Sequence, residues 1–213
     1  MRLLLFSDLH RDTGAAADLV KRARTADVVV GAGDYSTVHR GLDEIISILQ
    51  QIEAPTILVP GNNETIDELR QACSDWESAH VLHGNGVTVV GITFCGLGGG
   101  VPVTPFGPWS YDFTEQEALA LLSECPATSV LVSHSPPKGV VDVSADGENL
   151  GSTAVRDTAI AQNPLLVVCG HIHPSAGQQG MLGETPVVNA GPRGVEWELD
   201  IPPAIGNSLL QKT

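Results

Sequence analysis

The chain begins with MRLLLFSDLH, residues 1–10, in which an apolar run passes directly into an acid and a histidine. Residues 3–6 are all large and apolar, and a short continuous run of this kind is typical of a buried strand. Asp8 and His10 follow the run at once, which is not the pattern of a secretory signal peptide. The stretch therefore predicts a buried first strand whose carboxyl end carries polar side chains.

The same succession recurs four more times along the chain. Apolar runs at residues 28–30, 57–59, 130–132 and 165–168 end in Gly33-Asp34, Gly61-Asn62, Ser133-His134 and Gly170-His171-Ile172-His173. Helical patterns separate the early runs, at residues 15–24 behind a cap at Asp12 or Thr13, at 42–49 and at 65–73. This alternation predicts parallel strands with helices on both faces, in one α/β domain over residues 1–213 built as a two-layered sandwich. Residues 202–213 show no clear pattern and are expected to form a loose tail.

The middle of the chain changes character, with Gly84-Asn85-Gly86 inside the segment from residue 80 to residue 100. Gly-Asn-Gly between short apolar runs predicts two strands joined by a hairpin turn at this point. Thr114 and Glu117 have the spacing of a capping box, which predicts a helix from residue 114 onward. A further helix is expected at residues 153–161, followed by a strand at 164–173 and two strand runs within 185–201.

Composition limits the classes of protein that this sequence can represent. Of 213 residues, 42% are hydrophobic and 17% are charged, which suits one sizeable core and excludes a disordered chain. The formal net charge of −14 disfavours nonspecific binding to nucleic acid or to anionic membrane, and no apolar run is long enough to span a bilayer. The four cysteines have no paired spacing, so we expect reduced thiols and a cytoplasmic location.

Seven polar side chains stand just beyond the predicted strands, where open α/β sheets bind their ligands. We expect one rim to gather Asp8, His10, Asp34, Asn62, His134, His171 and His173. This mixture of nitrogen and oxygen ligands suits manganese, iron or zinc, and the number of groups suits two ions that share a bridging carboxylate. Two ions contribute about +4 against two carboxylates and a hydroxide, which leaves a site of about +1 that can hold a phosphate.

The motifs resemble those of the calcineurin-like metallophosphoesterase family. The family pattern is Asp-x-His, Gly-Asp, Gly-Asn-His-Asp/Glu, a later His and Gly-His-x-His, and this sequence reads SDLH, GAGD, PGNNE, VSHSPP and CGHIH within residues 1–197. The resemblance implies a four-layered α/β/β/α sandwich of two sheets flanked by helices. It also implies one metal at Asp8, His10 and His173, a second at Asn62, His134 and His171, and Asp34 as the bridge. A hydroxide bridging the ions would then attack phosphorus in line.

One position departs from this pattern, because Asn63 stands where most members of the family have a histidine. That histidine is thought to protonate the leaving oxygen or to steady the transition state. An amide cannot donate a proton as an acid, and losing a general acid removes about 10²–10⁴ in rate. We therefore expect aryl phosphodiesters or anhydrides to be better substrates than alkyl monoesters. Glu64 is either a substitute acid or, the alternative we favour, an acid in the first turn of the next helix.

Two smaller features each leave two alternatives. Residues 104–114 concentrate four aromatic side chains in a chain with only 4% aromatics, namely Phe106, Trp109, Tyr111 and Phe113. They form either a wall for a nucleobase or aryl group, or a small core that pins a long loop. Arg193 is either a phosphate contact or a surface residue. We assign Asn63 and His134 to the catalytic centre, and Asn63 and Arg193 to substrate binding.

These observations predict a cytoplasmic, metal-dependent phosphoesterase acting on small phosphoesters, with phosphodiesters or activated esters preferred. Its cofactors are expected to be two divalent ions, manganese first and iron or zinc as alternatives. A second hypothesis is a catalytically weak or inactive scaffold of the same fold, which would require a damaged metal site. A third is a two-metal hydrolase of an amide or lactam. The intact ligand positions favour the phosphoesterase, and the sequence leaves the physiological substrate, the native metal pair and the oligomeric state open.

Overall fold

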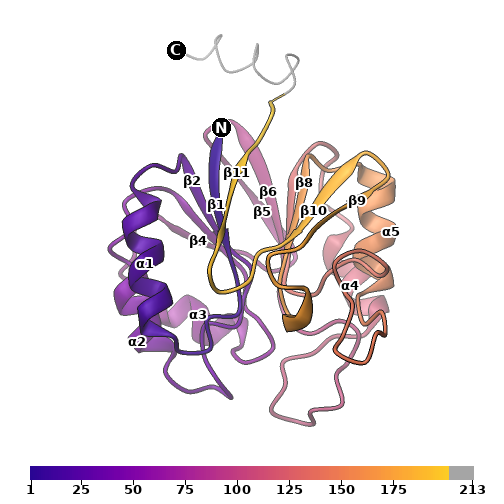
Figure 1. The fold of residues 1–213 in the computed structure, drawn as a ribbon, viewed down its shortest axis with the longest axis horizontal. Coiled ribbons are helices and arrows are strands. Elements are labelled where there is room, and N and C mark those ends of the chain that lie inside the picture. The colour runs from indigo at the N-terminus through magenta and orange to yellow at the C-terminus, as the bar shows by residue number, and fades with distance from the viewer. Residues whose placement is uncertain (202–213) are drawn as a thin grey trace.

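A computed structural model describes the protein over residues 1–201 (Figure 1). The loose tail predicted at residues 202–213 lies outside the described residues. Two β-sheets share one hydrophobic core between them, and helices cover their outer faces.

The first sheet has five strands in the order β11-β1-β2-β3-β4. Strands β1 to β4 run parallel, and β11 joins the edge antiparallel to β1. The bounds are Arg2–Phe6 for β1, Val28–Gly31 for β2, Thr56–Leu58 for β3, Ala79–Val81 for β4 and Val195–Glu198 for β11. The parallel strands confirm the prediction made from alternating strands and helices in the first half of the chain.

The second sheet has six strands in the order β5-β6-β7-β8-β10-β9, with parallel pairing from β6 to β10 and antiparallel edge strands. The bounds are Asn85–Val89 for β5, Ile92–Leu97 for β6, Val130–Ser133 for β7, Leu166–Cys169 for β8, Gln179–Leu182 for β9 and Thr185–Asn189 for β10. Strand β9 was not predicted, because its partly exposed Gln-Gly-Met-Leu sequence carries no strand pattern.

The helices lie outside the two sheets. In Figure 1, α1, α2 and α3 flank the first sheet, and α4 and α5 flank the second. Their bounds are Thr13–Ala23 for α1, Leu42–Leu49 for α2, Ile66–Ala72 for α3, Glu115–Leu122 for α4 and Thr153–Gln162 for α5, and a short 3₁₀ helix covers His173–Ser175.

Local sequence explains where the helices begin. The Asp12 side chain caps α1, so of the two predicted caps the aspartate is the one used. Thr65 and Glu68 form a capping box at the start of α3, and Thr114 and Glu117 form the predicted one at the start of α4. Each box satisfies backbone N–H groups that have no partner within the helix.

Alternation along the strands divides the side chains between separate cores. In β1, Leu3 and Leu5 contact the core between the sheets, whereas Leu4 and Phe6 pack in the cluster beneath α1 and α2. Each sheet therefore has helices on one face only, and the fold is the four-layered sandwich that the family resemblance implied. The prediction of two layers with helices on both faces is wrong, because the second sheet buries the face without helices.

The hairpin predicted at Gly84-Asn85-Gly86 is also wrong. This segment carries the chain from β4 in the first sheet to β5 in the second. The hairpin turn lies instead between β5 and β6, where Val90 and Gly91 have φ angles of 48° and 77°. Two successive positive φ angles are the geometry of a type I′ turn, which Asn-Gly favours and a β-branched residue disfavours.

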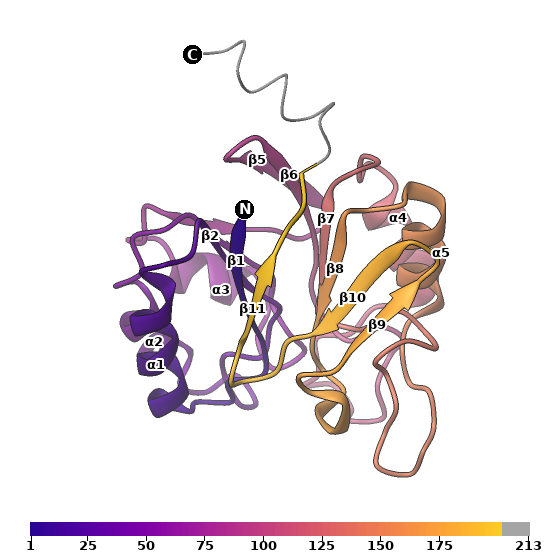
Figure 2. The ribbon, with the colours of Figure 1, turned by 45° about the horizontal axis from the view of Figure 1, so that its top comes forward.

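The two sheets meet at the rim formed by the carboxyl ends of their parallel strands. Figure 2 shows them side by side, with β11 beside β1 in one sheet and β9 beside β10 in the other. Hydrogen bonds cross between the sheets at this rim, from His134 Nδ1 to the Ala32 carbonyl and from the His171 backbone N–H to Asp8. The polar residues at the strand ends are thereby brought into contact.

None of the helices within residues 1–201 has the length and hydropathy needed to cross a bilayer. The four cysteines, all within the described residues, are buried and free of disulfides, as the sequence predicted.

Candidate metal centre

The structure brings the seven predicted metal-site residues together at this rim. They lie in the loops after β1 (Asp8, His10), β2 (Asp34), β3 (Asn62), β7 (His134) and β8 (His171, His173). Both sheets therefore contribute ligands, although Asp8 and His173 are more than a hundred positions apart in the sequence.

The ligand atoms form two groups, and Asp34 belongs to both. One group consists of Asp8, His10, Asp34 and His173, and the other consists of Asp34, His134 and His171, with the ligand atoms of each group within 4.8 Å of one another. Asn62 Oδ1 lies 3.2 Å from His134 Nε2, so the amide oxygen joins the second group.

The two carboxylate oxygens of Asp34 face different groups. Oδ2 lies 3.5 Å from His10 Nε2, and Oδ1 lies 3.6 Å from His134 Nε2. On the outer side of the first group, His10 Nε2 and His173 Nε2 are 2.9 Å apart. Two imidazole nitrogens at this separation need a proton or a cation between their lone pairs.

The arrangement fits divalent cations. Nitrogen and oxygen ligands bound at about 2.0–2.2 Å place their donor atoms up to about 4.4 Å apart around one ion, close to the spread of each group. Carboxylates, neutral imidazoles and an amide oxygen are ligands for borderline metals. The residues present can therefore hold two ions, with one oxygen of Asp34 directed toward each.

Backbone strain is concentrated in these loops. Asp8, His10, Asp34 and His171 have φ angles of 56°, 44°, 60° and 66°. Left-handed backbone is uncommon for residues other than glycine, and it persists where the surrounding structure enforces it. Each loop turns sharply at its strand end, and the turn directs the polar side chain back toward the rim.

Two motif glycines allow the backbone to approach the carboxylates. A Cβ atom at Gly61 would collide with Asp34 Oδ1, and one at Gly170 would lie 2.5 Å from Asp8 Oδ2. Any larger residue at either position would displace an acid of the cluster. The glycines of the Gly-Asn and Gly-His motifs are therefore required by packing against Asp34 and Asp8.

Neighbouring groups fix the orientation of two site side chains. His134 Nδ1 lies 2.7 Å from the Ala32 carbonyl, to which it donates its proton, so that Nε2 keeps its lone pair for the cluster. Asp8 accepts hydrogen bonds from the Ser7 hydroxyl at 2.5 Å and from the His171 backbone N–H at 3.0 Å.

Burial and charge set the ionisation of the cluster. Burial would raise the pKa of Asp8, but the His173 imidazole, whose Nε2 lies 3.6 Å from Asp8 Oδ1, and the charge of His134 lower it to about 2. Burial lowers the pKa of His171 to about 3, so this imidazole is neutral and free to bind a metal. Burial would lower the pKa of His134, but the carboxylates of Asp34 and Asp8 raise it. A divalent cation would take the place of the proton that these carboxylates attract.

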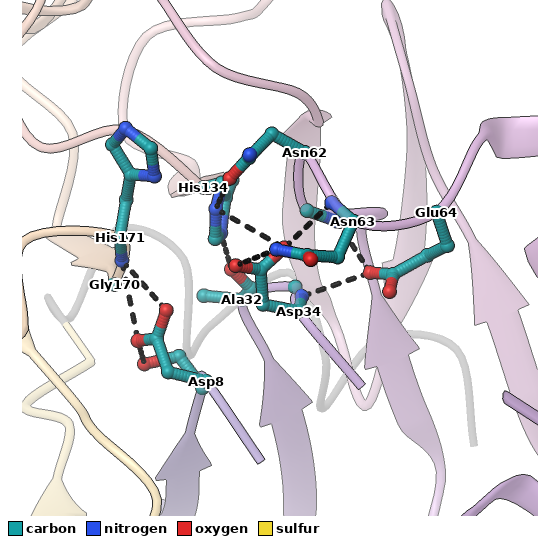
Figure 3. A network of polar contacts seen from close by, with 12 residues as sticks. Asp8, Ala32, Asp34, Asn62, Asn63, Glu64, His134, Gly170 and His171 are labelled. Atoms are coloured by element: carbon teal, nitrogen blue, oxygen red, sulfur yellow. Dashed lines mark hydrogen bonds and ion pairs between the residues drawn. The ribbon is translucent and has the colours of Figure 1, made fainter. Parts of the chain in front are cut away.

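Asn63 is held by the protein on both sides of its amide. Its Nδ2 donates to Asp34 Oδ2 at 2.8 Å (Figure 3). Its Oδ1 accepts the Val38 backbone N–H at 2.8 Å. The backbone N–H of Asn63 also donates to Asp34, at 2.9 Å. The asparagine therefore positions the carboxylate shared by the two ligand groups, a role that its sequence context did not reveal.

Glu64 has neither of the roles considered for it from the sequence. It is fully buried, lies before the cap of α3, and accepts backbone N–H groups from Gly61 at 2.7 Å, Asp34 at 2.8 Å and Ser36 at 3.0 Å. Burial and the nearby Asp34 raise the pKa of Glu64, while the backbone donors oppose that shift. Glu64 joins the loop after β2 to the loop after β3 through these hydrogen bonds. It does not line the cavity that lies beside the candidate metal ligands.

Asn189 lies beside the site and was not among the predicted site residues. Its side chain is fully buried at the end of β10 and donates to the carbonyls of Gly170 and Ile172, on either side of His171. The signal was available, because Asn189 follows an apolar run as the other site residues do. Arg193 is exposed and is not among the residues that line the cavity at the centre.

Several solved structures share this fold. TT1561 of Thermus thermophilus matches with a TM-score of 0.69 and 23% identity, over 89% of this chain and 88% of that chain. A dimetal phosphatase from Danio rerio matches with a TM-score of 0.59 and 15% identity, over 89% and 86%. The phosphopantetheinyl hydrolase of Mycobacterium tuberculosis matches with a TM-score of 0.54 and 17% identity, over 89% and 88%.

No curated protein sequence matches the chain. A family model described as the calcineurin-like phosphoesterase superfamily domain, however, matches residues 1–201. This range contains all five motifs and both sheets. The chain therefore belongs to the calcineurin-like phosphoesterase superfamily.

Proposed function

We propose that this chain hydrolyses phosphoesters at a centre of two divalent metal ions, with manganese as the first candidate. The observation that carries the proposal is Asp34, whose two oxygens face separate groups of ligand atoms. Bound there, two such ions supply Lewis acidity for the phosphoryl oxygens and lower the pKa of a water molecule that acts as nucleophile. We assign one ion to Asp8, His10 and His173, the other to Asn62, His134 and His171, and the bridge to Asp34.

The cavity offers no obvious proton donor for the leaving group. Among the described residues, the titratable side chains that line it are His10, Asp34, His171 and His173, all of which we assign as ligands. Asn63 also lines the cavity, but its amide cannot act as a general acid and is hydrogen-bonded to Asp34. We therefore infer that the preferred substrates are phosphodiesters or esters whose leaving groups depart without protonation, such as aryl esters and anhydrides.

We also propose that residues 1–213 form one metallophosphoesterase domain located in the cytoplasm. The core shared by the two sheets supports a single domain. The four free, buried cysteines support a reducing compartment.

The test combines metal analysis with turnover. The protein is purified, stripped with a chelator, dialysed against manganese and assayed with bis(p-nitrophenyl) phosphate. We expect two manganese ions per chain and manganese-dependent release of p-nitrophenol. Asp34→Asn should reduce the bound metal and lower kcat by at least about 10²-fold, because the bridge loses one charge and one ligand oxygen.

Asp75→Asn provides the matched control, because Asp75 is exposed between α3 and β4 and does not line the cavity. Its metal content and kcat should equal those of the wild type. A wild-type protein with no stoichiometric metal and no manganese-stimulated turnover would refute the proposal and favour the scaffold hypothesis. Turnover of a lactam but of no phosphoester would favour the two-metal amide hydrolase.

A further inference from the structure

The cavity at the candidate metal centre has a second, apolar side. Its volume is about 560 Å³, and the residues that line it include both candidate ligands and a set that we call the aromatic wall: Val103, Phe106, Trp109 and Leu150. Phe106 is 51% exposed and Val103 is 58% exposed, and exposed apolar side chains gathered in one patch mark an interaction site. The ligand groups and the aromatic wall therefore face the same volume.

The structure separates the aromatic residues of this segment into two pairs. The rings of Phe106 and Trp109 stack with centroids 5.7 Å apart and an interplanar angle of 13°. Tyr111 and Phe113 pack instead around His83, with the Phe113 and His83 centroids 4.8 Å apart. Of the two alternatives left by the sequence, the first pair lines the cavity and the second forms the small core that holds the loop.

The aromatic wall is fixed to the candidate metal centre by hydrogen bonds. The Asn62 Nδ2 group donates to the Ser110 hydroxyl at 2.9 Å, and the Tyr111 backbone N–H donates to the Asn62 carbonyl at 3.0 Å. The Trp109 carbonyl lies 2.6 Å from His39 Nε2. One loop thus contacts a predicted ligand and carries the stacked rings, and a preorganised surface loses little entropy when it binds a ligand.

Charge limits what this side of the cavity can accept. Within residues 1–201 no lysine or arginine lines it, and the whole chain has a net charge of −14. A second phosphate or carboxylate on the substrate would find no counter-charge here. The bound molecule must therefore have its negative charge at the phosphoryl group beside the ligands.

Hydrogen-bonding side chains on this side are few, and those of Thr104 and Ser144 already take part in hydrogen bonds within the protein. The Thr104 hydroxyl donates to Asp112 at 2.6 Å, and the Ser144 hydroxyl accepts the Glu148 backbone N–H at 3.1 Å. A nucleobase needs partners for its polar edges, and leaving those edges unpaired in a cavity is costly. An unsubstituted aromatic ring has no such requirement and gains from contact with stacked rings.

We propose that the aromatic wall is a binding subsite for an uncharged aromatic arm of a phosphodiester substrate. This proposal rests on the proposed function, because the phosphoryl group is placed at the candidate ligands. It specifies the substrate class: a monoanionic diester with at least one flat, apolar ester group, and neither a nucleotide nor a polyphosphate.

Binding of phosphinates tests the subsite without turnover, because their carbon–phosphorus bonds resist hydrolysis. Manganese-loaded protein is titrated calorimetrically with dimethylphosphinate, diphenylphosphinate and bis(4-carboxyphenyl)phosphinate. We expect diphenylphosphinate to bind at least about tenfold more tightly than dimethylphosphinate. The carboxylated compound should bind at least about tenfold more weakly than diphenylphosphinate, because no cation lines the aromatic wall within the described chain.

Two variants assign the preference to the aromatic wall. Trp109→Ala and Phe106→Ala should each reduce the diphenyl-to-dimethyl affinity ratio about fivefold while dimethylphosphinate affinity is kept. Phe106 is half-exposed, so Phe106→Ala should leave the melting temperature unchanged. This variant therefore tests the subsite even if Trp109→Ala lowers the melting temperature. Ile160→Ala is the control, because Ile160 is 62% exposed on α5 and does not line the cavity.

A wild-type ratio near one, a ratio unchanged in both variants, or tight binding of the carboxylated compound would each overturn the subsite. The proposed function is checked separately by turnover of methyl p-nitrophenyl phosphate. Turnover without an aromatic preference in binding would refute the subsite alone. Absence of both metal and turnover would refute the proposed function and, because the phosphoryl group is placed at the candidate ligands, the subsite with it.

Discussion

Replacement of Glu64 by alanine tests why the loops after β2 and β3 keep a fixed spacing. The carboxylate is fully buried and accepts the backbone N–H groups of Gly61, Asp34 and Ser36 at 2.7–3.0 Å, and that of Tyr35 at 3.4 Å. Alanine removes both carboxylate oxygens that accept these hydrogen bonds. The N–H groups would then be buried without partners unless water entered the vacated volume.

The magnitude follows from the number of donors. A buried N–H group left without a partner costs about 1–3 kcal/mol, and three of the bonds are short. The loss is partly offset, because the variant no longer buries a charge beside Asp34; burial and that neighbour both raise the pKa of Glu64. We expect a net loss of about 3 kcal/mol in the free energy of unfolding, which lowers the Tm of a chain of this size by about 6–12 °C.

The assay is thermal unfolding followed by circular dichroism in chelator-containing buffer, so that metal binding does not contribute. Glu64→Gln should fall between wild type and Glu64→Ala, because it keeps one acceptor oxygen and replaces the other with a donor. Glu53→Ala, at an exposed acid in the loop between α2 and β3, should leave the Tm unchanged. A Glu64→Ala protein that melts within about 2 °C of wild type would refute this role for the carboxylate.

Three further outcomes are expected. Asn63→His places a proton donor at the cavity, so kcat for an alkyl monoester should rise about 10²-fold while that for an aryl diester stays within about twofold; steady-state rates showing equal changes would contradict this. Burial and Arg70 lower the pKa of His83 from 6.5 to about 4, and its Nδ1 accepts the Gly98 N–H. Because the folded value lies below the unfolded one, the stability linked to His83 is complete above pH 6.5 and is lost as the pH falls toward 4. His83→Asn, which keeps an acceptor, should therefore lose less stability than wild type in urea titrations between pH 7 and pH 4, and parallel losses would exclude this linkage. Gly61→Ala should abolish the manganese-induced rise in Tm, because its Cβ atom would collide with the Asp34 carboxylate, and a retained rise would show that the loop adapts.

Much of the candidate site was predictable because its chemistry is tied to strand ends. In an open parallel sheet all carboxyl ends point to one rim, so a polar residue after each apolar run is sufficient to predict convergence. Asp8, Asp34 and His134 could be placed together on this basis, and the structure brings them there. The capping box at Thr114 was predictable for a similar reason, since both partners lie within four residues.

Contacts that depend on distant segments were not predictable. Strand β4 pairs with β3 and not with β5, because β3 offers a free edge of the first sheet. The turn at Val90 uses a left-handed backbone conformation that valine disfavours. Asn63 faces Asp34 and Val38, and Glu64 faces the loop after β2, through bonds that span 25 to 30 residues.

The sequence alone determined which residue types stand at the strand ends, and with them a rim rich in imidazole and carboxylate. The tertiary structure decided how those residues divide, with one oxygen of Asp34 facing each group, and which aromatic rings share their cavity. The reason is physical: strand and helix patterns arise from interactions between near neighbours in the chain. The direction of a buried side chain depends instead on atoms that only the packing of both sheets brings within reach.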